Sequence, residues 1–241
     1  VEKLITPKTK AVIAVHLYGV PANLLALRTL CDKHNLFLVE DCAESLGASI
    51  DGVHCGRAGH ISTYSFFGNK TITTGEGGAI YTEIDSIYDR AISLKSQGLA
   101  KHREYWHDII GYNFRMTNIA AAIGCAQMER VEDIVSKKRE IDSTYRSQLE
   151  GRSLTFQGLH QGVLSSAWMT TCLAKSERQR DKIRSVITQN GIETRPTFFP
   201  VHTMPMYSKN YSYLPCTESV ALRGFSLPSS PKLTLDQVRE I

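Results

Sequence analysis

The sequence lacks a long hydrophobic run. No apolar stretch among its 241 residues approaches the roughly 18 residues that a membrane-spanning helix requires. Residues 1–5 (VEKLI) show no signal-peptide pattern either. These absences argue against a membrane-spanning protein and predict a cytoplasmic one.

The sequence also lacks a strong excess of either charge. Its 28 Lys and Arg and 24 Asp and Glu give a net charge of +4, and the basic residues are dispersed along the chain. Proteins that bind nucleic acid or anionic membranes usually gather their basic residues in a patch. We therefore expect neither partner, although a mild positive field suits an anionic substrate.

Paired cysteines are absent as well. The sequence has six cysteines but no Cys-x-x-Cys pair, and several of them stand in predicted core elements. A chain of this size without an export signal is expected to keep such thiols reduced. His102, His107 and Asp108 stand close together but match no standard metal spacing, so we expect no metal site.

The hydrophobic pattern predicts an α/β fold. A chain of 241 residues, 42% of them hydrophobic, is long enough for one large domain or two small ones. Residues 11–18 predict a buried strand, residues 21–34 a helix and residues 35–41 a second strand. This β-α-β order predicts a mostly parallel sheet with right-handed crossovers.

The rest of the sequence predicts further elements of this large domain and then a smaller domain. They are strands at 61–67, 77–82, 154–158 and 166–174, helices at 85–97, 117–151 and 176–191, an irregular segment at 98–116, an extended segment at 192–200 and a helix from 234 onward. Residues 176–179 and 234–237 match the capping box that begins a helix. We place the domain boundary inside the long helix, with a large domain at 1–136 and a small α+β domain at 137–241.

Lys70 stands between the predicted strands at 61–67 and 77–82. Gly68 and Asn69 form the tight connection that presents it, and a glycine cluster follows at 75–78. A lysine in such a turn is usually solvated, so a catalytic role requires partners. The glycine cluster fits a hairpin connection or a close approach to a ligand, and it matches neither a P-loop nor a dinucleotide fingerprint.

Asp41 is the first candidate partner. The apolar run 36–39 ends in Glu40 and Asp41, as a buried parallel strand does where its carboxyl end opens on a crevice. Asp41 either caps a turn at this strand end or, together with Glu44, meets a ligand there.

These positions resemble the DegT-type sugar aminotransferases, which are pyridoxal-phosphate enzymes of fold type I. The resemblance is carried by residues 39–47 (VEDCAESLG), 65–70 (SFFGNK) with 75–78 (GEGG), 111–118 (GYNFRMTN), and 195–200 (RPTFFP) with His202 and 204–207 (MPMY). It implies a mostly parallel large domain followed by a smaller α+β domain. It also implies that both ends of this sequence are cut, since roughly the family's first third has no counterpart here.

The resemblance implies a role for each cofactor-binding residue. Lys70 is expected to anchor pyridoxal 5'-phosphate and to carry the proton between substrate and cofactor, and Asp41 to keep the pyridine nitrogen protonated. Because the anchoring amine must be unprotonated, we expect Lys70 to be buried, where loss of water favours the neutral form. Glu44 matches the position near the ring hydroxyl, where many family members have glutamine.

The phosphate is expected to meet Ser65 and Asn113. In the family, the asparagine reaches the phosphate from the neighbouring subunit, so the resemblance implies a homodimer with shared sites. From the residues alone, Ser65 fits a strand serine that faces solvent equally well, and Asn113 fits a simple turn.

The resemblance further implies a nucleotide-linked sugar, for which His107, Arg195 and His202 are the candidate ligands. The planar fork of Arg195 suits a pyrophosphate. From the residues alone, a structural ion pair for Arg195 and structural roles for both histidines are the commoner alternatives.

The predicted function is amino-group transfer from glutamate to a nucleotide-linked 4-keto-6-deoxy sugar, with GDP-4-keto-6-deoxymannose as first choice. The product is expected to enter surface polysaccharide such as O-antigen. A UDP-linked keto sugar is the alternative substrate. A non-catalytic binding module is the alternative function, since the missing first third carries the phosphate loop and the stacking aromatic in the family. A keto-sugar dehydratase of this fold has histidine in place of the lysine, so Lys70 argues against it.

Overall fold

The computed structural model describes residues 1–241, apart from the side chain of Asn210. The chain folds into two compact units. The first comprises Val1–Val135 and His160–Ser166, and the second comprises Ser136–Leu159 and Ala167–Ile241. A short segment of the chain therefore returns to the first unit after the second unit has begun.

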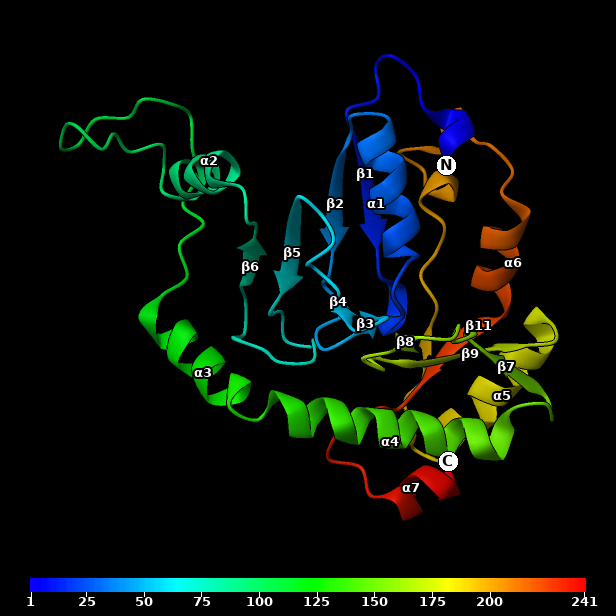
Figure 1. Cartoon of the computed structure of the whole chain (residues 1–241). Coiled ribbons are helices and arrows are strands. Elements are labelled where there is room, and N and C mark those ends of the chain that lie inside the picture. Colours follow the sequence, from blue (N-terminus) through cyan, green and yellow to red (C-terminus); the bar gives the residue numbers. More distant parts are fainter. The chain divides into compact units, whose positions relative to one another are not determined.

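The first unit is built on a four-stranded sheet in the order β1-β2-β5-β6 (Figure 1). Its strands are β1 (Ala11–Val15), β2 (Phe37–Asp41), β5 (Ile61–Ser65) and β6 (Gly78–Tyr81), and helix α1 (Leu24–Lys33) connects β1 to β2. β1, β2 and β5 are parallel, whereas β6 is antiparallel to β5. The predicted β-α-β unit and the α/β class are therefore confirmed.

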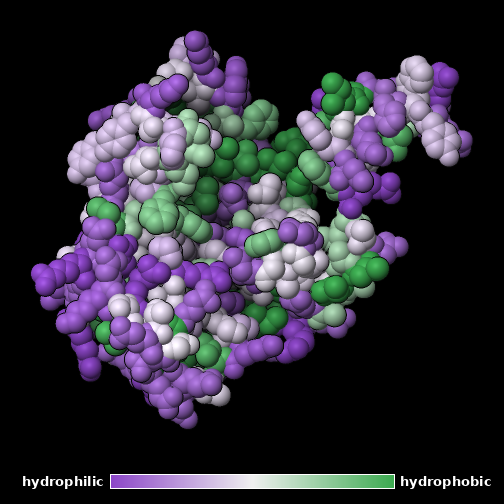
Figure 2. Space-filling view, turned by 180° about the vertical axis from the view of Figure 1, so that it is seen from behind, coloured by the Kyte–Doolittle hydropathy of each residue, from purple (hydrophilic) through white to green (hydrophobic). Residues whose placement is uncertain are grey.

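The prediction of a buried strand at 11–18 is wrong in its length and in its burial. β1 ends at Val15, and the 3-10 turn η2 (Leu17–Gly19) follows it. Ala14 is buried in a cluster with Cys31 of α1, whereas Ile13 is 67% exposed. Successive side chains of a strand point to opposite faces, so the helix covers one face of β1 and leaves apolar side chains on the other. Exposed apolar surface of the protein is green in Figure 2.

β5 and β6 are the two strands predicted around Lys70, and they pair as an antiparallel hairpin. Ser65 pairs with Gly78, and the N–H of Phe66 donates to the carbonyl of Gly77. A Cβ atom on Gly78 would lie 2.5 Å from the carbonyl oxygen of Tyr64, so the strands approach this closely only with glycine at that position. At Gly78 the glycine cluster therefore serves the hairpin.

The first unit contains further helices and strands outside this sheet. They are η1 (Glu2–Leu4), β3 (Ser49–Ile50), β4 (Val53–His54), α2 (Asp85–Lys95), α3 (Asn118–Met128) and β8 (Val163–Leu164), and α4 (Val131–Leu149) runs from the first unit into the second. Residues 98–116 have no named helix or strand within the described chain, as predicted. The single helix predicted for 117–151 is wrong, because it is divided into α3 and α4. The N–H of Glu129 still bonds to the carbonyl of Cys125, four residues back, but the N–H of Arg130 bonds to that of Gln127, three residues back, and this tighter turn ends α3 without Pro or Gly.

The second unit contains an antiparallel sheet in the order β10-β11-β9-β7. Its elements are β7 (Leu154–Phe156), β9 (Thr170–Ala174), α5 (Glu177–Gln189), β10 (Arg195–Pro196), η3 (Val201–Thr203), η4 (Ser208–Asn210), α6 (Pro215–Arg223), β11 (Gly224–Leu227) and α7 (Leu235–Glu240). Its core gathers Tyr145, Phe156, Phe225 and Val238. The α+β prediction is confirmed. The strand predicted from residue 166 begins only at Thr170, since Ala167 has a φ of 49° and leaves the extended region.

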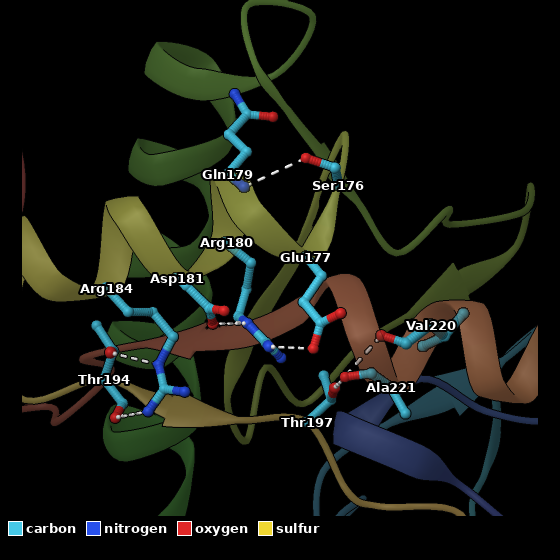
Figure 3. A network of polar contacts seen from close by, with 10 residues as sticks. All are labelled: Ser176, Glu177, Gln179, Arg180, Asp181, Arg184, Thr194, Thr197, Val220 and Ala221. Atoms are coloured by element: carbon cyan, nitrogen blue, oxygen red, sulfur yellow. Dashed lines mark hydrogen bonds and ion pairs between the residues drawn. The ribbon is translucent and has the colours of Figure 1, made fainter.

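Polar contacts fix helix α5 near its start and along its length (Figure 3). The hydroxyl of Ser176 accepts the N–H of Gln179 at 3.2 Å, but the Gln179 side chain accepts the N–H of Lys175. Only half of the predicted capping box forms here, whereas the box at 234–237 is complete. Arg184 donates from Nε and Nη2 to the hydroxyl and carbonyl of Thr194, at 3.1 and 3.3 Å. These two bonds hold the residue that precedes β10.

No helix among the described residues combines the length and the apolar composition needed to cross a bilayer.

Candidate active site

Polar side chains gather where β2 and β5 end. Asp41 is the last residue of β2 and pairs in parallel register with Thr63 of β5. Ser65 is the last residue of β5, and Lys70 follows in the connection to β6. Since the carboxyl ends of parallel strands meet at one edge of a sheet, these residues share that edge, which is where ligands of open α/β sheets bind.

The Lys70 side chain is largely shielded from water. The backbone N–H of Lys70 donates to the carbonyl of Phe67 at 3.0 Å, which closes the tight turn after β5. The side chain is 14% exposed, and its Nζ lies 3.8 Å from Oε1 of Glu44. The sequence expectation of a solvated turn lysine therefore does not hold for this one, and the amine has a carboxylate partner.

Glu44 is buried beside Lys70. Its Oε2 accepts the backbone N–H of Tyr18 at 2.7 Å. Burial raises the pKa of the Glu44 carboxyl, and the charge of Asp41 acts in the same direction, whereas the Tyr18 N–H and the charge of Lys70 oppose the rise. The charges of Lys70 and Asp41 therefore both act on the Glu44 carboxyl, and the three residues form one electrostatic cluster.

Asp41 and Ser65 both make local bonds at their strand ends. Oδ1 of Asp41 accepts the N–H of Ala43 at 3.0 Å, so the turn-capping role that the sequence offered for Asp41 is present. The hydroxyl of Ser65 accepts the N–H of Phe67 at 3.3 Å. This bond leaves the hydroxyl proton of Ser65 available for donation to an anion.

The structure places Asn113 and His107 on the irregular segment of the first unit. The backbone of Asn113 bridges to Ser96, and its side chain is exposed. Nδ1 of His107 lies 2.7 Å from the carbonyl oxygen of Gln97, and the residue is exposed. Both residues are thus held by partners of their own segment and its neighbouring helix end.

Arg195 and His202 belong to the second unit, and each has a partner there. Nε of Arg195 lies 3.2 Å from Oε1 of Glu193, in an exposed ion pair of the kind that contributes little to stability. Nε2 of His202 lies 3.0 Å from Oε1 of Glu218. The structural alternatives that the sequence offered for these two residues are therefore present.

A second buried group contains His16, Glu40 and Cys42, whose ligand atoms lie within 4.8 Å of one another. Both ring nitrogens of His16 are engaged, because Nδ1 accepts the N–H of Ala22 and Nε2 donates to Oε2 of Glu40, each at 3.1 Å. Burial raises the pKa of the Cys42 thiol to about 12, so this thiol stays protonated. His16 and Glu40 thus belong to a buried hydrogen-bonded network.

Sequence reasoning missed Tyr18 and Ser166 at the site. Tyr18 supplies the N–H that Glu44 accepts, and the hydroxyl of Ser166 donates to the Glu44 carbonyl at 2.9 Å. Gly19, which follows Tyr18, indicates a turn in the sequence, but it does not indicate that the N–H of Tyr18 points toward Glu44. Ser166 gave no signal, because it lies 122 positions after Glu44 in the sequence.

Three comparisons place the chain among known proteins. A model of the family described as the DegT/DnrJ/EryC1/StrS aminotransferase family matches residues 1–241. A GDP-perosamine synthase of Escherichia coli O157:H7 is 48% identical over 99% of this chain and 65% of its own length. A GDP-perosamine synthase of Vibrio cholerae is 46% identical over all of this chain and 67% of its own length. The chain thus spans about two thirds of the relatives that it matches.

Solved structures show the same fold. The chain resembles DesV of S. venezuelae, solved in complex with a ketimine intermediate, with a TM-score of 0.92 and 31% identity over 99% of this chain and 65% of that one. It also resembles the aminotransferase TlmJ from Streptoalloteichus hindustanus, with a TM-score of 0.92 and 28% identity over 99% of this chain and 65% of that one. The fold predicted from the sequence is therefore confirmed.

Proposed function

This chain belongs to the DegT/DnrJ/EryC1/StrS aminotransferase family, and we propose that it carries the lysine-bearing part of a pyridoxal-phosphate-dependent aminotransferase. One observation carries the proposal: a shielded amine, Lys70, faces the buried Glu44 carboxyl at 3.8 Å, beside the strand end that bears Asp41. An aminotransferase needs an amine and a carboxylate at such a sheet edge.

The residues present fit pyridoxal phosphate. Lys70 offers an amine shielded from water, which suits attachment of an aldehyde. Asp41 offers a carboxylate, which suits a protonated ring nitrogen, and Ser65 offers a hydroxyl proton to a phosphate. The donor set therefore includes a group for the aldehyde, for the ring and for the phosphate.

Each of these residues has a stated task in the proposed reaction. Pyridoxal phosphate, when bound, supplies an electron sink. Nζ of Lys70 would hold the cofactor through its aldehyde and, once released, would move a proton at the reacting carbon. Asp41 would hold a proton on the ring nitrogen, Glu44 would meet the ring hydroxyl, and Ser65 would bind the phosphate together with Asn113 of a second subunit.

We propose GDP-4-keto-6-deoxymannose as the amino acceptor and GDP-perosamine as the product. The proposal is supported by the relatives that are 48% and 46% identical, both of which are named GDP-perosamine synthases. Glutamate as amino donor, a homodimer and a cytoplasmic setting belong to the same proposal. Arg195 and His107 are proposed to meet the nucleotide, and His202, whose Nε2 is held by Glu218, offers Nδ1.

The cofactor part of the proposal is tested on the full-length protein by borohydride reduction after incubation with pyridoxal phosphate. We expect a yellow protein in which reduction fixes the cofactor on the peptide that contains Lys70. Lys70→Ala should stay unlabelled, and Lys101→Ala, which removes an exposed lysine, should label as the parent does. A parent protein that stays colourless and unlabelled would favour the non-catalytic binding module.

The substrate part of the proposal is tested by an assay of amino transfer from glutamate to GDP-linked and UDP-linked 4-keto-6-deoxy sugars. We expect the GDP sugar to be the better acceptor. Preference for the UDP sugar would replace the first choice of substrate but would keep the reaction class.

A further inference from the structure

Glu44 is held at both its side chain and its backbone. The Tyr18 N–H donates to its carboxyl at 2.7 Å, and the Ser166 hydroxyl donates to its backbone carbonyl at 2.9 Å. Ser166 is fully buried, so water does not compete for this bond. The position of the Glu44 carboxyl therefore depends on two bonds from two distant parts of the chain.

The turn that contains Tyr18 is held in an unfavourable backbone conformation. Tyr18 has a φ of 56°, in the left-handed region that residues other than glycine rarely adopt. Such a conformation persists when the surrounding bonds fix it. The next residue, Gly19, provides them, because its carbonyl accepts both the hydroxyl of Ser165 at 2.9 Å and the N–H of Ser166 at 3.0 Å.

Ser166 thus bonds to both loops that meet at Glu44. Its N–H fixes the turn of Tyr18 through Gly19, and its hydroxyl fixes Glu44 itself. Ser166 ends the segment His160–Ser166, which returns to the first unit and pairs there as β8 with β3. A strand pairing on one side and two loop contacts on the other leave this serine little freedom.

We infer that Ser166 is a positioning residue that sets the distance between Glu44 and Lys70. The inference rests on the proposed function, because the distance between Glu44 and Lys70 affects catalysis only if Lys70 is the reactive amine. Without the hydroxyl, the Glu44 carbonyl has lost a buried donor, and the residue is expected to turn away from Lys70. Serine at this place then acts on the amine through Glu44 and without touching it.

The inference is tested on the amine itself, in the full chain without cofactor. A small acylating reagent such as acetic anhydride labels only the neutral form of an amine, and a nearby carboxylate favours the charged form. Labelling of Lys70 is read by mass spectrometry and normalised to the exposed Lys101. We expect Glu44→Gln to speed labelling by about tenfold, as loss of an opposite charge at this range should.

The serine variants follow from this reference. Ser166→Ala should speed labelling by about fivefold, the factor that a typical hydrogen bond represents. Ser166→Thr keeps the hydroxyl and should stay within about twofold of the parent. Because the position is fully buried, Ser166→Cys is the second conservative variant, and its weaker donor should give a value between those of Ala and the parent.

Ser229→Ala is the matched control. The Ser229 hydroxyl also donates to a backbone carbonyl, that of Trp168, at 3.4 Å within the second unit. Its loss should leave the labelling of Lys70 unchanged, whatever it does to stability. The inference is wrong if Lys70 is labelled at the same rate in Ser166→Ala and Ser229→Ala while Glu44→Gln raises that rate. It is also wrong if Lys70 is labelled at the same rate in Glu44→Gln and in the parent.

The uptake of pyridoxal phosphate, measured in parallel, separates this inference from the proposed function. A parent chain that takes up no pyridoxal phosphate overturns the proposed function and the catalytic meaning of Ser166 with it. The other outcome is a parent chain that takes up the cofactor and a Ser166→Ala variant that matches it in labelling and in the pH dependence of the cofactor absorbance. That result overturns the role of Ser166 and leaves the proposed function in place.

Discussion

Two buried glutamates stand four positions apart, at and just beyond the end of β2, and their surroundings differ. Glu40 accepts three hydrogen bonds, from His16 at 3.1 Å, from the Gly56 N–H at 2.7 Å and from the Gly59 N–H at 2.5 Å. The carboxyl of Glu44 accepts the N–H of Tyr18 and faces Lys70 at the longer distance of 3.8 Å. Similar burial therefore accompanies a saturated carboxyl in one case and a sparsely bonded one in the other.

The two carboxyls also differ in their tendency to hold a proton. Burial alone would raise the pKa of Glu40, but the hydrogen bonds from His16, Gly56 and Gly59 outweigh burial and lower it. For Glu44, burial prevails and raises the pKa. Because hydrogen-bond donors occupy both oxygens of Glu40, its carboxyl is held as an anion with a structural role. The protonation of the Glu44 carboxyl depends instead on the charge of Lys70, which faces it. The comparison teaches that the donors around a buried carboxyl, rather than its burial, separate a structural role from a chemical one.

The largest effect is expected from Glu40→Gln. The amide NH2 would face donors that now meet a carboxylate, so at least one buried donor would lose its partner. We expect a loss of about 3–5 kcal/mol in the free energy of unfolding, the range for breaking a buried charged network. Urea unfolding of the full chain measures it, with Glu44→Gln as the matched variant. A loss for Glu40→Gln no larger than that for Glu44→Gln would remove the distinction between the two residues.

The next effect comes from Lys138, a buried cation that, among the described residues, donates to neutral acceptors. Its Nζ donates to the carbonyls of Trp168 at 3.1 Å and Ser229 at 3.0 Å. Burial lowers the pKa of this amine from 10.5 to about 8. Between these values the unfolded chain binds a proton that the folded chain does not, so this group makes stability rise as the pH rises from about 8 to about 10.5.

Lys138→Met tests that sign. A shift of this size corresponds to about 3 kcal/mol. This full cost lowers the stability of the folded state at pH values below the pKa of the amine in the folded state. The free energy of unfolding of Lys138→Met relative to the parent should therefore be most favourable below about pH 8 and should fall as the pH approaches 10.5. Urea unfolding across this range measures it, and the neighbouring Lys137→Met, which removes a partly exposed lysine, is the control. A difference that does not change with pH would contradict the burial of the amine.

The residues that the sequence located are those at the ends of apolar runs. Asp41 ends one predicted strand and Lys70 follows another, and parallel pairing brings strand ends to one edge of a sheet, so the placement of both at that edge follows from local pattern. The pattern could not show which face of β1 is covered, because Ile13 and Ala14 are both apolar and only packing separates them. The end of α3 at Met128 was missed for a related reason, since its sequence contains neither Pro nor Gly there.

The residues that the sequence could not locate act over long separations. Ser166 reaches Glu44 across 122 positions, and a serine in a predicted strand is ordinary. Tyr18 adopts a positive φ that its residue type disfavours, so the conformation is imposed by its surroundings rather than encoded locally. Tyr18 and Ser166 were identified only from their hydrogen bonds to Glu44 in the structure.

Glu44→Gln is expected to have a moderate effect that separates activity from stability. Glutamine keeps an oxygen for the Tyr18 N–H but removes the charge that faces Lys70. We expect the free energy of unfolding to change by less than about 1 kcal/mol and, if the proposed function holds, kcat to fall by about tenfold. Urea unfolding and the amino-transfer assay measure the two values. A loss of stability as large as that of Glu40→Gln would assign Glu44 a structural role.

The smallest effect concerns the backbone donors of the two carboxyls. Glu40 takes one N–H from Gly56, which adopts a φ of 95° without penalty, whereas Glu44 takes its N–H from Tyr18 at a φ of 56°. Both Tyr18→Gly and Tyr18→Ala remove the ring and keep the N–H, but only glycine is relaxed in this conformation. Glycine is usually the less stable of the two residues, and here we expect it to be the more stable by about 1 kcal/mol. Urea unfolding of both variants measures the difference. If alanine is the more stable variant, the turn is not left-handed in solution, and the donor of Glu44 is then no more strained than that of Glu40.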